Sequence, residues 1–280
     1  MNDTAEYAAL AAAIGEAARA AGAIALDFFE HGGKTRATVE YKDGGSPVSE
    51  ADIAVDRFLH ARLTALAPEA GWLSEESADD PVRLDKGRVF VVDPIDGTRA
   101  FINGDRRWGV AIALVGAGRP LAGVLYMPAL DELYTAALGS GAARNGLAIR
   151  ASTQSTLGGA RIAGPKKALD ALTAKFSIEQ EPRIPSLAYR LARVASGELD
   201  AALASTDAWD WDIAAADLIV REAGGSLTGL DGRPPQYNLP RPRHGILAAA
   251  GQGIHAPLME ALRAVVPANV SAPAPQAKTS

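Results

Sequence analysis

The sequence predicts an α+β domain over residues 1–150, an α/β domain over residues 151–266 and a tail over residues 267–280. Three observations predict this order. Apolar residues recur at helical spacing early in the chain, strand-like runs follow between residues 88 and 137, and strands then alternate with helices. The tail (PANVSAPAPQAKTS) is expected to be disordered, because a segment rich in Pro, Ala and Ser buries too little apolar surface to offset its conformational entropy.

Two helices are expected first. The Ala-rich segment from Thr4 to Glu30 predicts a long helix that ends near Gly32. A second helix is expected to begin at residues 49–52 (SEAD), which match a capping box. Its predicted apolar face consists of Val55, Phe58, Leu59, Leu63 and Leu66.

Several strands are expected next. Residues 88–93 (RVFVVD) form a short apolar run typical of a buried strand, and Pro94 is expected to end it because proline cannot donate to the ladder. Further runs separated by turn residues predict an antiparallel meander over residues 109–115, 121–126 and 133–137.

The second half of the chain predicts alternating elements. The expected strands span residues 160–163, 199–204 and 246–250, and the expected helices span residues 166–176, 187–197, 212–223 and 257–266. Gly224 and Gly225 are expected to end the third of these helices, because glycine adopts the left-handed backbone of a helix C-terminus at little cost.

Composition excludes several classes of protein. The net charge of −5 argues against a nucleic-acid polymer as partner, because such affinity depends on Lys and Arg that neutralise phosphates. The absence of cysteine excludes disulfide frameworks, thiolate zinc sites and Cys nucleophiles, and it favours a cytoplasmic location. The N-terminus (MNDTAEYAAL) carries acids where a signal peptide carries Lys or Arg, and no transmembrane segment is expected.

The densest chemical signal is residues 93–98 (DPIDGT), directly after the buried strand. The carboxylates of Asp93 and Asp96 can converge across this turn, and carboxylate oxygen is the ligand that Mg²⁺ prefers. Gly97 allows a ligand to approach the backbone, and a helix start at Thr98 offers N–H groups to a phosphate. The alternative is an acidic turn that only caps a helix.

Two further acidic blocks have structural alternatives of their own. Residues 73–77 (LSEES) contain adjacent glutamates, which usually form a solvated surface pair. In residues 209–216 (WDWDIAAA), Asp212 is equally suited to cap the helix that follows, and Trp211 is typical of a core anchor. Asp52 is explained equally well by its capping box.

Taken together, the SEES, DPIDGT and WDIAA blocks resemble the inositol monophosphatase superfamily in order and spacing. The resemblance covers residues 48–225, and it is expected to extend to everything except the tail. It implies a layered αβαβα sugar-phosphatase fold and a metal-dependent phosphomonoesterase.

The resemblance also implies residue roles. Glu75, Asp93 and the carbonyl of Ile95 are expected to hold the ion that activates the attacking water. A second ion is expected among Asp93, Asp96 and Asp212, with Mg²⁺ as the metal, two or three ions per site and Li⁺ as an inhibitor. Glu75, Thr98 and Asp52 are the expected catalytic residues, Glu76 is expected to support them, and the expected substrate contacts are Asp96, Gly97, Thr98, Ala188 and Asp212. Since these carboxylates would repel one another without cations, Mg²⁺ is expected to stabilise the protein.

The substrate remains open among inositol phosphates, 3'-phosphoadenosine 5'-phosphate, histidinol phosphate and fructose 1,6-bisphosphate. Inositol-type enzymes commonly carry a glutamate seven positions before the WD aspartate, where this chain has Ser205, although Asp207 could substitute. Residues 97–102 (GTRAFI) resemble bacterial 3'(2'),5'-bisphosphate nucleotidases and also histidinol-phosphatases. Arg99, or Arg190 beside the expected substrate segment Ser186 to Ala188, could pair with a second phosphate, although an arginine is more often a surface residue. The bisphosphate nucleotidase is the favoured prediction.

Other classes fit less well. The DPIDG segment does not match a calcium-binding DxDxDG loop, neither GxGxxG nor GxxxxGK[ST] occurs in the required context, and the four histidines are scattered singly. A regulatory scaffold that keeps the fold and binds proteins stays an alternative. A homodimer is common in the superfamily and is a possible assembly here.

Overall fold

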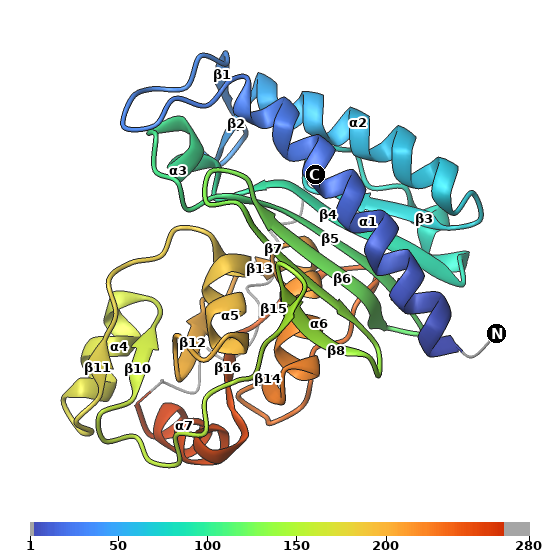
Figure 1. The fold of residues 1–280 in the computed structure, drawn as a ribbon. Coiled ribbons are helices and arrows are strands. Elements are labelled where there is room, and N and C mark those ends of the chain that lie inside the picture. The colour runs from blue at the N-terminus through green and yellow to red at the C-terminus, as the bar shows by residue number, and fades with distance from the viewer. Residues whose placement is uncertain (1–2, 266–280) are drawn as a thin grey trace, which may run out of the picture.

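The computed structural model describes residues 3–265, so the predicted tail lies outside the described residues. Five layers are stacked in the order helices, sheet, helices, sheet, helices (Figure 1). Three separate hydrophobic clusters fill the spaces between these layers. Each sheet therefore buries both faces, which explains its long apolar runs.

The first helical layer and the larger sheet come from residues 3–148. The outer helices are α1 (Asp3–Leu26) and α2 (Glu50–Leu66), with a small hairpin of β1 (Val39–Tyr41) and β2 (Pro47–Ser49) between them. The seven-stranded sheet has the order β3-β4-β5-β6-β7-β8-β9. Its members are β3 (Gly71–Ser74), β4 (Arg88–Asp96), β5 (Gly109–Gly116), β6 (Arg119–Met127), β7 (Glu132–Ala137), β8 (Gly141–Arg144) and β9 (Leu147–Ala148), with a 3₁₀ helix η1 (Pro81–Asp85) before β4 and α3 (Thr98–Ile102) after it.

The remaining layers come from residues 161–265. The middle helices are α5 (Leu187–Ala195) and α6 (Asp210–Glu222). The five-stranded sheet has the order β11-β10-β12-β16-β14, and α4 (Lys166–Thr173) and α7 (Gln252–Val265) cover its outer face. Its members are β10 (Arg161–Ala163), β11 (Glu179–Gln180), β12 (Ala201–Ala204), β14 (Gly225–Gly229) and β16 (Leu247–Gly251), and β13 (Ala208–Trp209) pairs separately with β15 (Arg243–His244).

The antiparallel meander predicted over residues 109–137 is confirmed as β5, β6 and β7. The turn at Asn145-Gly146 is present, with positive φ angles of 49° and 78°. Gly224 ends α6 with a φ of 84°, as expected for a glycine at a helix C-terminus. The boundary that we propose at residue 150 falls between the last strand of the larger sheet and the first strand of the smaller one.

Several predicted boundaries are wrong: α1 ends at Leu26 rather than near Gly32, and α6 begins at Asp210 rather than at Asp212. β4 does not stop at Asp93 but runs through Pro94 to Asp96, because a bulge between Asp93 and Asp96 takes the proline out of the ladder with β5. α7 begins at Gln252 rather than near Pro257. Ile254 and Leu258 lie one turn apart and are fully buried, so their burial outweighs the ~3 kcal/mol that a helical proline costs.

α1 is the one described helix that is long and apolar enough to span a membrane. Its small buried residues, among them Ala18 and Ala21, pack in the cluster formed with α2 and the larger sheet.

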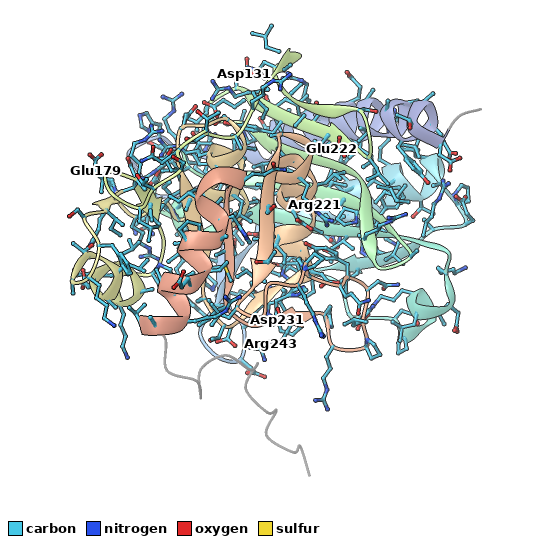
Figure 2. All side chains as sticks on the ribbon, turned by 90° about the horizontal axis from the view of Figure 1, so that it is seen from below. Asp131, Glu179, Arg221, Glu222, Asp231 and Arg243 are labelled. Atoms are coloured by element: carbon cyan, nitrogen blue, oxygen red, sulfur yellow. The ribbon has the colours of Figure 1, made fainter. Side chains whose placement is uncertain are left out.

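The C-terminal end of α6 is bonded to the larger sheet through Glu222. Its carboxylate accepts the backbone N–H groups of Gly139 and Gly141 at 2.9 and 2.8 Å. This contact, near the labelled Glu222 in Figure 2, ties the C-terminal end of α6 to the turn between β7 and β8.

Candidate active site

Asp93 and Asp96 lie on the two sides of the β4 bulge. Asp93 pairs with Ala111 of β5 and Asp96 pairs with Gly109, so three peptide units of β4 span a shorter stretch of its partner. The backbone N–H of Ile95 donates to Asp93 Oδ1 at 3.0 Å, which holds the bulge in shape. β3 pairs with β4 only as far as Val92, so the bulge lies beyond the C-terminal end of β3.

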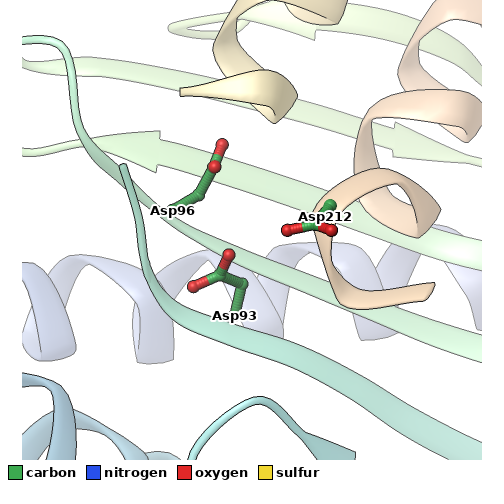
Figure 3. Close-up of side chains that lie close together, drawn as sticks. All are labelled: Asp93, Asp96 and Asp212. Atoms are coloured by element: carbon green, nitrogen blue, oxygen red, sulfur yellow. The ribbon is translucent and has the colours of Figure 1, made fainter. Parts of the chain in front are cut away.

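Asp212 reaches the same place from α6, whose N-terminus begins two residues earlier than predicted. Its Oδ2 accepts the backbone N–H of Trp209 at 2.6 Å, so Asp212 does contribute to capping its helix. It also faces the bulge. Asp93, Asp96 and Asp212 each offer a carboxylate oxygen, and these oxygens all lie within 4.8 Å of one another (Figure 3).

Without a bound cation, burial and mutual repulsion make it unfavourable for all three carboxylates to be ionised. Burial raises the pKa of Asp93 well above its usual range, and the charges of Glu75, Asp96 and Asp212 raise it further. Burial, together with the charges of Asp96 and Glu75, likewise raises the pKa of Asp212 well above its usual range. Three hard oxygen donors that repel one another fit a divalent cation, which would replace that repulsion by attraction.

Asp96 is also bonded to the first turn of α5. It accepts hydrogen bonds from Ser186 Oγ at 2.5 Å, from the N–H of Leu187 at 3.2 Å and from the N–H of Ala188 at 2.7 Å. Burial raises the pKa of Asp96 to about 6, although these donors oppose the shift. The backbone N–H of Ala188, a predicted substrate contact, is therefore engaged by Asp96.

Glu75 and Glu76 follow β3 and are paired with a lysine. Lys42 Nζ lies 3.2 Å from Glu75 Oε1 and 2.8 Å from Glu76 Oε1. Glu75 is near enough to raise the pKa of Asp93, but it does not belong to the triplet of mutually close oxygens. Burial raises the pKa of Glu76 to about 7 against the opposing effect of Lys42.

Thr98 lies at the start of α3, beside Asp52. Its hydroxyl donates to the carbonyl of Ile95 at 3.1 Å and lies 3.4 Å from Asp52 Oδ1. The other oxygen of Asp52 accepts the N–H and the hydroxyl of Ser49 at 2.8 and 2.6 Å, so the predicted capping contact exists as well. Gly97 has a φ of 94° and precedes the helix, where an added Cβ would lie 3.3 Å from the carbonyl oxygen of Arg107.

The two arginines considered for a second phosphate differ sharply in environment. Arg99 is exposed and donates to the carbonyl of Gly45 at 2.7 Å. Arg190 is largely buried and donates to the carbonyl of Leu203 at 2.8 Å, and its Nε has no hydrogen-bond partner among residues 3–265. It lines a cavity of about 520 Å³ that also includes Leu187 and Ser205.

Two residues around the site, Lys42 and Asp56, were not anticipated from the sequence. Lys42 lies in a Gly-rich hairpin and gave no signal except its charge. Ser186, the first residue of the expected substrate segment, is the N-cap of α5, and its Oγ accepts the N–H of Tyr189 at 3.0 Å. Asp56 follows Asp52 by one helical turn, which places both on neighbouring parts of α2.

Comparison with known proteins agrees with this geometry. Residues 6–266 match the model of the inositol monophosphatase family. The chain is 32% identical to the inositol-1-monophosphatase of Mesorhizobium japonicum over 246 residues, which cover 80% of this chain and 86% of that protein. It is also 32% identical to the 3'(2'),5'-bisphosphate nucleotidase of Aggregatibacter actinomycetemcomitans over 212 residues, which cover 72% of this chain and 78% of that protein.

A solved structure shares the fold. The extragenic suppressor protein suhB of Bartonella henselae superimposes with a TM-score of 0.80 at 32% identity, covering 92% of this chain and 100% of that one. The predicted layered αβαβα fold is therefore confirmed. With its triplet of closely spaced carboxylates in the same fold, this chain is a metal-dependent phosphomonoesterase and belongs to the inositol monophosphatase family.

Proposed function

We propose that this enzyme is a Mg²⁺-dependent 3'(2'),5'-bisphosphate nucleotidase that hydrolyses 3'-phosphoadenosine 5'-phosphate to AMP and phosphate. The observation that carries the proposal is Arg190. Its guanidinium is largely buried and lines the cavity, close enough to Asp96 for their charges to interact. A largely buried cation that lines a cavity beside a phosphomonoesterase site suits a substrate with a second anionic group.

The rest of the cavity is compatible with an anion. Arg183 also lines it, and its side chain forms no ion pair among the described residues. Lys166 contributes a further cation, although its Nζ is paired with Asp170 at 2.9 Å. Glu181 is the one carboxylate of the cavity lining, so cationic side chains outnumber it.

The same cavity gives little support to a polyol leaving group. Ser205 lines the cavity at the position where inositol-type enzymes commonly carry a glutamate. Asp207, the residue that could substitute, is 2.6 Å from a guanidinium nitrogen of Arg243 and is already paired with it. Ring hydroxyls would therefore meet no free carboxylate from this segment.

For the reaction, we assign the ions to Asp93, Asp96 and Asp212, with Glu75 and the carbonyl of Ile95 completing the set. Bound divalent ions supply a water of lowered pKa and neutralise charge on the phosphoryl and leaving oxygens. The Thr98 hydroxyl would orient the attacking water and pass its proton toward Asp52. Because burial raises the pKa of Asp52 to about 6, that carboxylate is ionised above neutral pH and can accept the proton.

The proposal is tested by measuring phosphate release from 3'-phosphoadenosine 5'-phosphate, inositol 1-phosphate and histidinol phosphate. We expect Mg²⁺-dependent activity, loss of activity with EDTA and inhibition by Li⁺. A charged hydrogen bond of ~1.5–3 kcal/mol predicts that kcat/KM for the bisphosphate exceeds the others by about tenfold or more. A clear preference for the inositol ester or for histidinol phosphate would overturn the substrate assignment and leave the reaction class in place.

A regulatory scaffold is the alternative of a different class. An Asp93→Asn variant separates the two, because it removes a candidate metal ligand from the buried site and leaves the surface unchanged. Metal-dependent phosphate release that disappears in this variant supports the enzyme.

A further inference from the structure

Asp56 is hydrogen-bonded to the segment that carries Glu75 and Glu76, and the proposed reaction gives it no role. It belongs to α2, is 7% exposed and forms no ion pair among residues 3–265. Each of its oxygens instead accepts one serine hydroxyl. Ser74 Oγ donates to Oδ1 at 2.5 Å and Ser77 Oγ donates to Oδ2 at 2.6 Å.

These two serines flank the glutamates in the SEES segment, so Asp56 holds the segment at both ends. Ser74 Oγ also accepts the backbone N–H of Glu76 at 3.3 Å, and Ser77 Oγ accepts Trp72 Nε1–H at the same distance. The backbone N–H of Glu75 donates to the carbonyl of Val92 on β4 at 3.3 Å. The segment is thereby fixed relative to the strand that carries Asp93.

The Asp56 carboxylate decides which atoms donate and which accept in the hydrogen bonds of the Ser74 and Ser77 hydroxyl groups. An ionised carboxylate only accepts, so both serines must donate to it and turn their lone pairs toward Glu76 and Trp72. An asparagine would present an amide N–H₂ to one of the two hydroxyls and would reverse that bond. A residue needed only to fill space would not require an acceptor on both sides.

We propose that Asp56 is a positioning residue for the metal site, which orients Glu75 toward the ion through Ser74 and Ser77. This inference rests on the proposed role of Glu75 as a metal ligand. Partners that orient a metal ligand typically contribute about 10- to 100-fold to metal affinity. Ser74 and Ser77 donate their hydroxyl hydrogen atoms to Asp56 and thereby connect it to the segment that carries Glu75.

The test is the dissociation constant of Mg²⁺ measured by calorimetry on the full chain. Asp56→Asn and Ser77→Ala are expected to weaken Mg²⁺ binding about tenfold or more. Ser77→Thr keeps the hydroxyl and is expected to bind Mg²⁺ as the wild type does, because Ser77 lines an open cavity of about 500 Å³ that can take the extra methyl group. The loss of phosphate release in Asp56→Asn should be recovered at saturating Mg²⁺.

Asp200→Asn is the matched control. Asp200 is 4% exposed and accepts Ser152 Oγ at 2.5 Å and the backbone N–H of Arg161 at 2.8 Å, so it makes a comparable clamp on the smaller sheet, with an added ion pair to the Arg161 side chain at 3.3 Å. Its substitution is expected to lower the melting temperature without changing Mg²⁺ affinity.

An Asp56→Asn protein that loses stability like Asp200→Asn but keeps wild-type Mg²⁺ affinity would overturn the inference. If Asp56→Asn does not fold, the comparison of Ser77→Ala with Ser77→Thr decides, and equal Mg²⁺ affinity of the two overturns it. A wild-type protein that binds no Mg²⁺ would overturn this inference and the proposed function together. Weakened Mg²⁺ binding with a preference for another phosphate ester supports the inference and rejects only the nucleotidase.

Discussion

The carboxylate of Asp96 accepts the backbone N–H of Ala188 at 2.7 Å, across 92 residues of sequence. A candidate metal ligand on the seven-stranded sheet is thereby bonded to the first turn of a helix that packs on the five-stranded sheet. The geometry of the site therefore depends on both parts of the chain being folded and packed together.

Asp93→Asn is expected to abolish phosphate release and to remove the stabilisation by Mg²⁺. In the metal-free protein the same change should leave the melting temperature unchanged or raise it, because it removes one of several buried like charges. Thermal unfolding with EDTA and with millimolar Mg²⁺ measures both effects. A Mg²⁺-induced shift as large as that of the wild type would show that Asp93 is not a ligand.

The metal-free protein is expected to lose stability as the pH rises from about 4 to about 7. Burial raises the pKa of Asp96 to about 6 and that of Glu76 to about 7, above the values of roughly 4 in an unfolded chain. The folded state then binds protons more tightly, so this contribution is full below about pH 4 and disappears as the carboxyls ionise.

Mg²⁺ needs the ionised carboxylates, so its stabilising effect should grow over the same pH range. Melting temperatures measured against pH, with EDTA and with Mg²⁺, check both slopes. Asp93→Asn is the control that isolates the cluster from other titrating groups. Parallel curves with and without Mg²⁺ would contradict the prediction.

Arg190→Gln is expected to reduce kcat/KM for 3'-phosphoadenosine 5'-phosphate about tenfold or more and to change it little for a monophosphate ester. The reason is that Arg190 lines the cavity, where it would pair with the second phosphate, a group that a monophosphate ester lacks. Arg99→Gln is the control, because that guanidinium is bonded to the carbonyl of Gly45. Equal losses on both substrates would mean that Arg190 serves the structure and not the choice of substrate.

His244→Ala is expected to destabilise the protein by about 1–3 kcal/mol, because it leaves a buried carboxylate short of one hydrogen bond. His244 Nε2 lies 2.7 Å from Asp210 Oδ1, and Asp210 is fully buried at the start of α6. Urea unfolding measures the loss. His60→Ala is the control, since the ring of His60 makes an edge contact with Trp72 and forms no hydrogen bond among the described residues. A loss of the same size there would argue against a specific role for the bond.

The sequence alone determined the features that depend on neighbouring residues. The meander of β5 to β7, the C-terminus of α6 at Gly224 and the acidic DPIDGT turn all follow from local periodicity, turn residues and carboxylate spacing. The resemblance of three short blocks was then enough to predict the layered fold and the phosphomonoesterase class.

Only the tertiary structure decided what depends on pairing between distant segments. β4 continues past Pro94 because β5 accommodates a bulge there, and no property of residues 88–96 reveals that partner. Lys42 meets Glu76, and Asp56 meets Ser77, because packing of α2 and its preceding hairpin brings them together. Arg190 differs from Arg99 for the same reason: burial is a property of the packed layers, whereas the two side chains are chemically identical in the sequence.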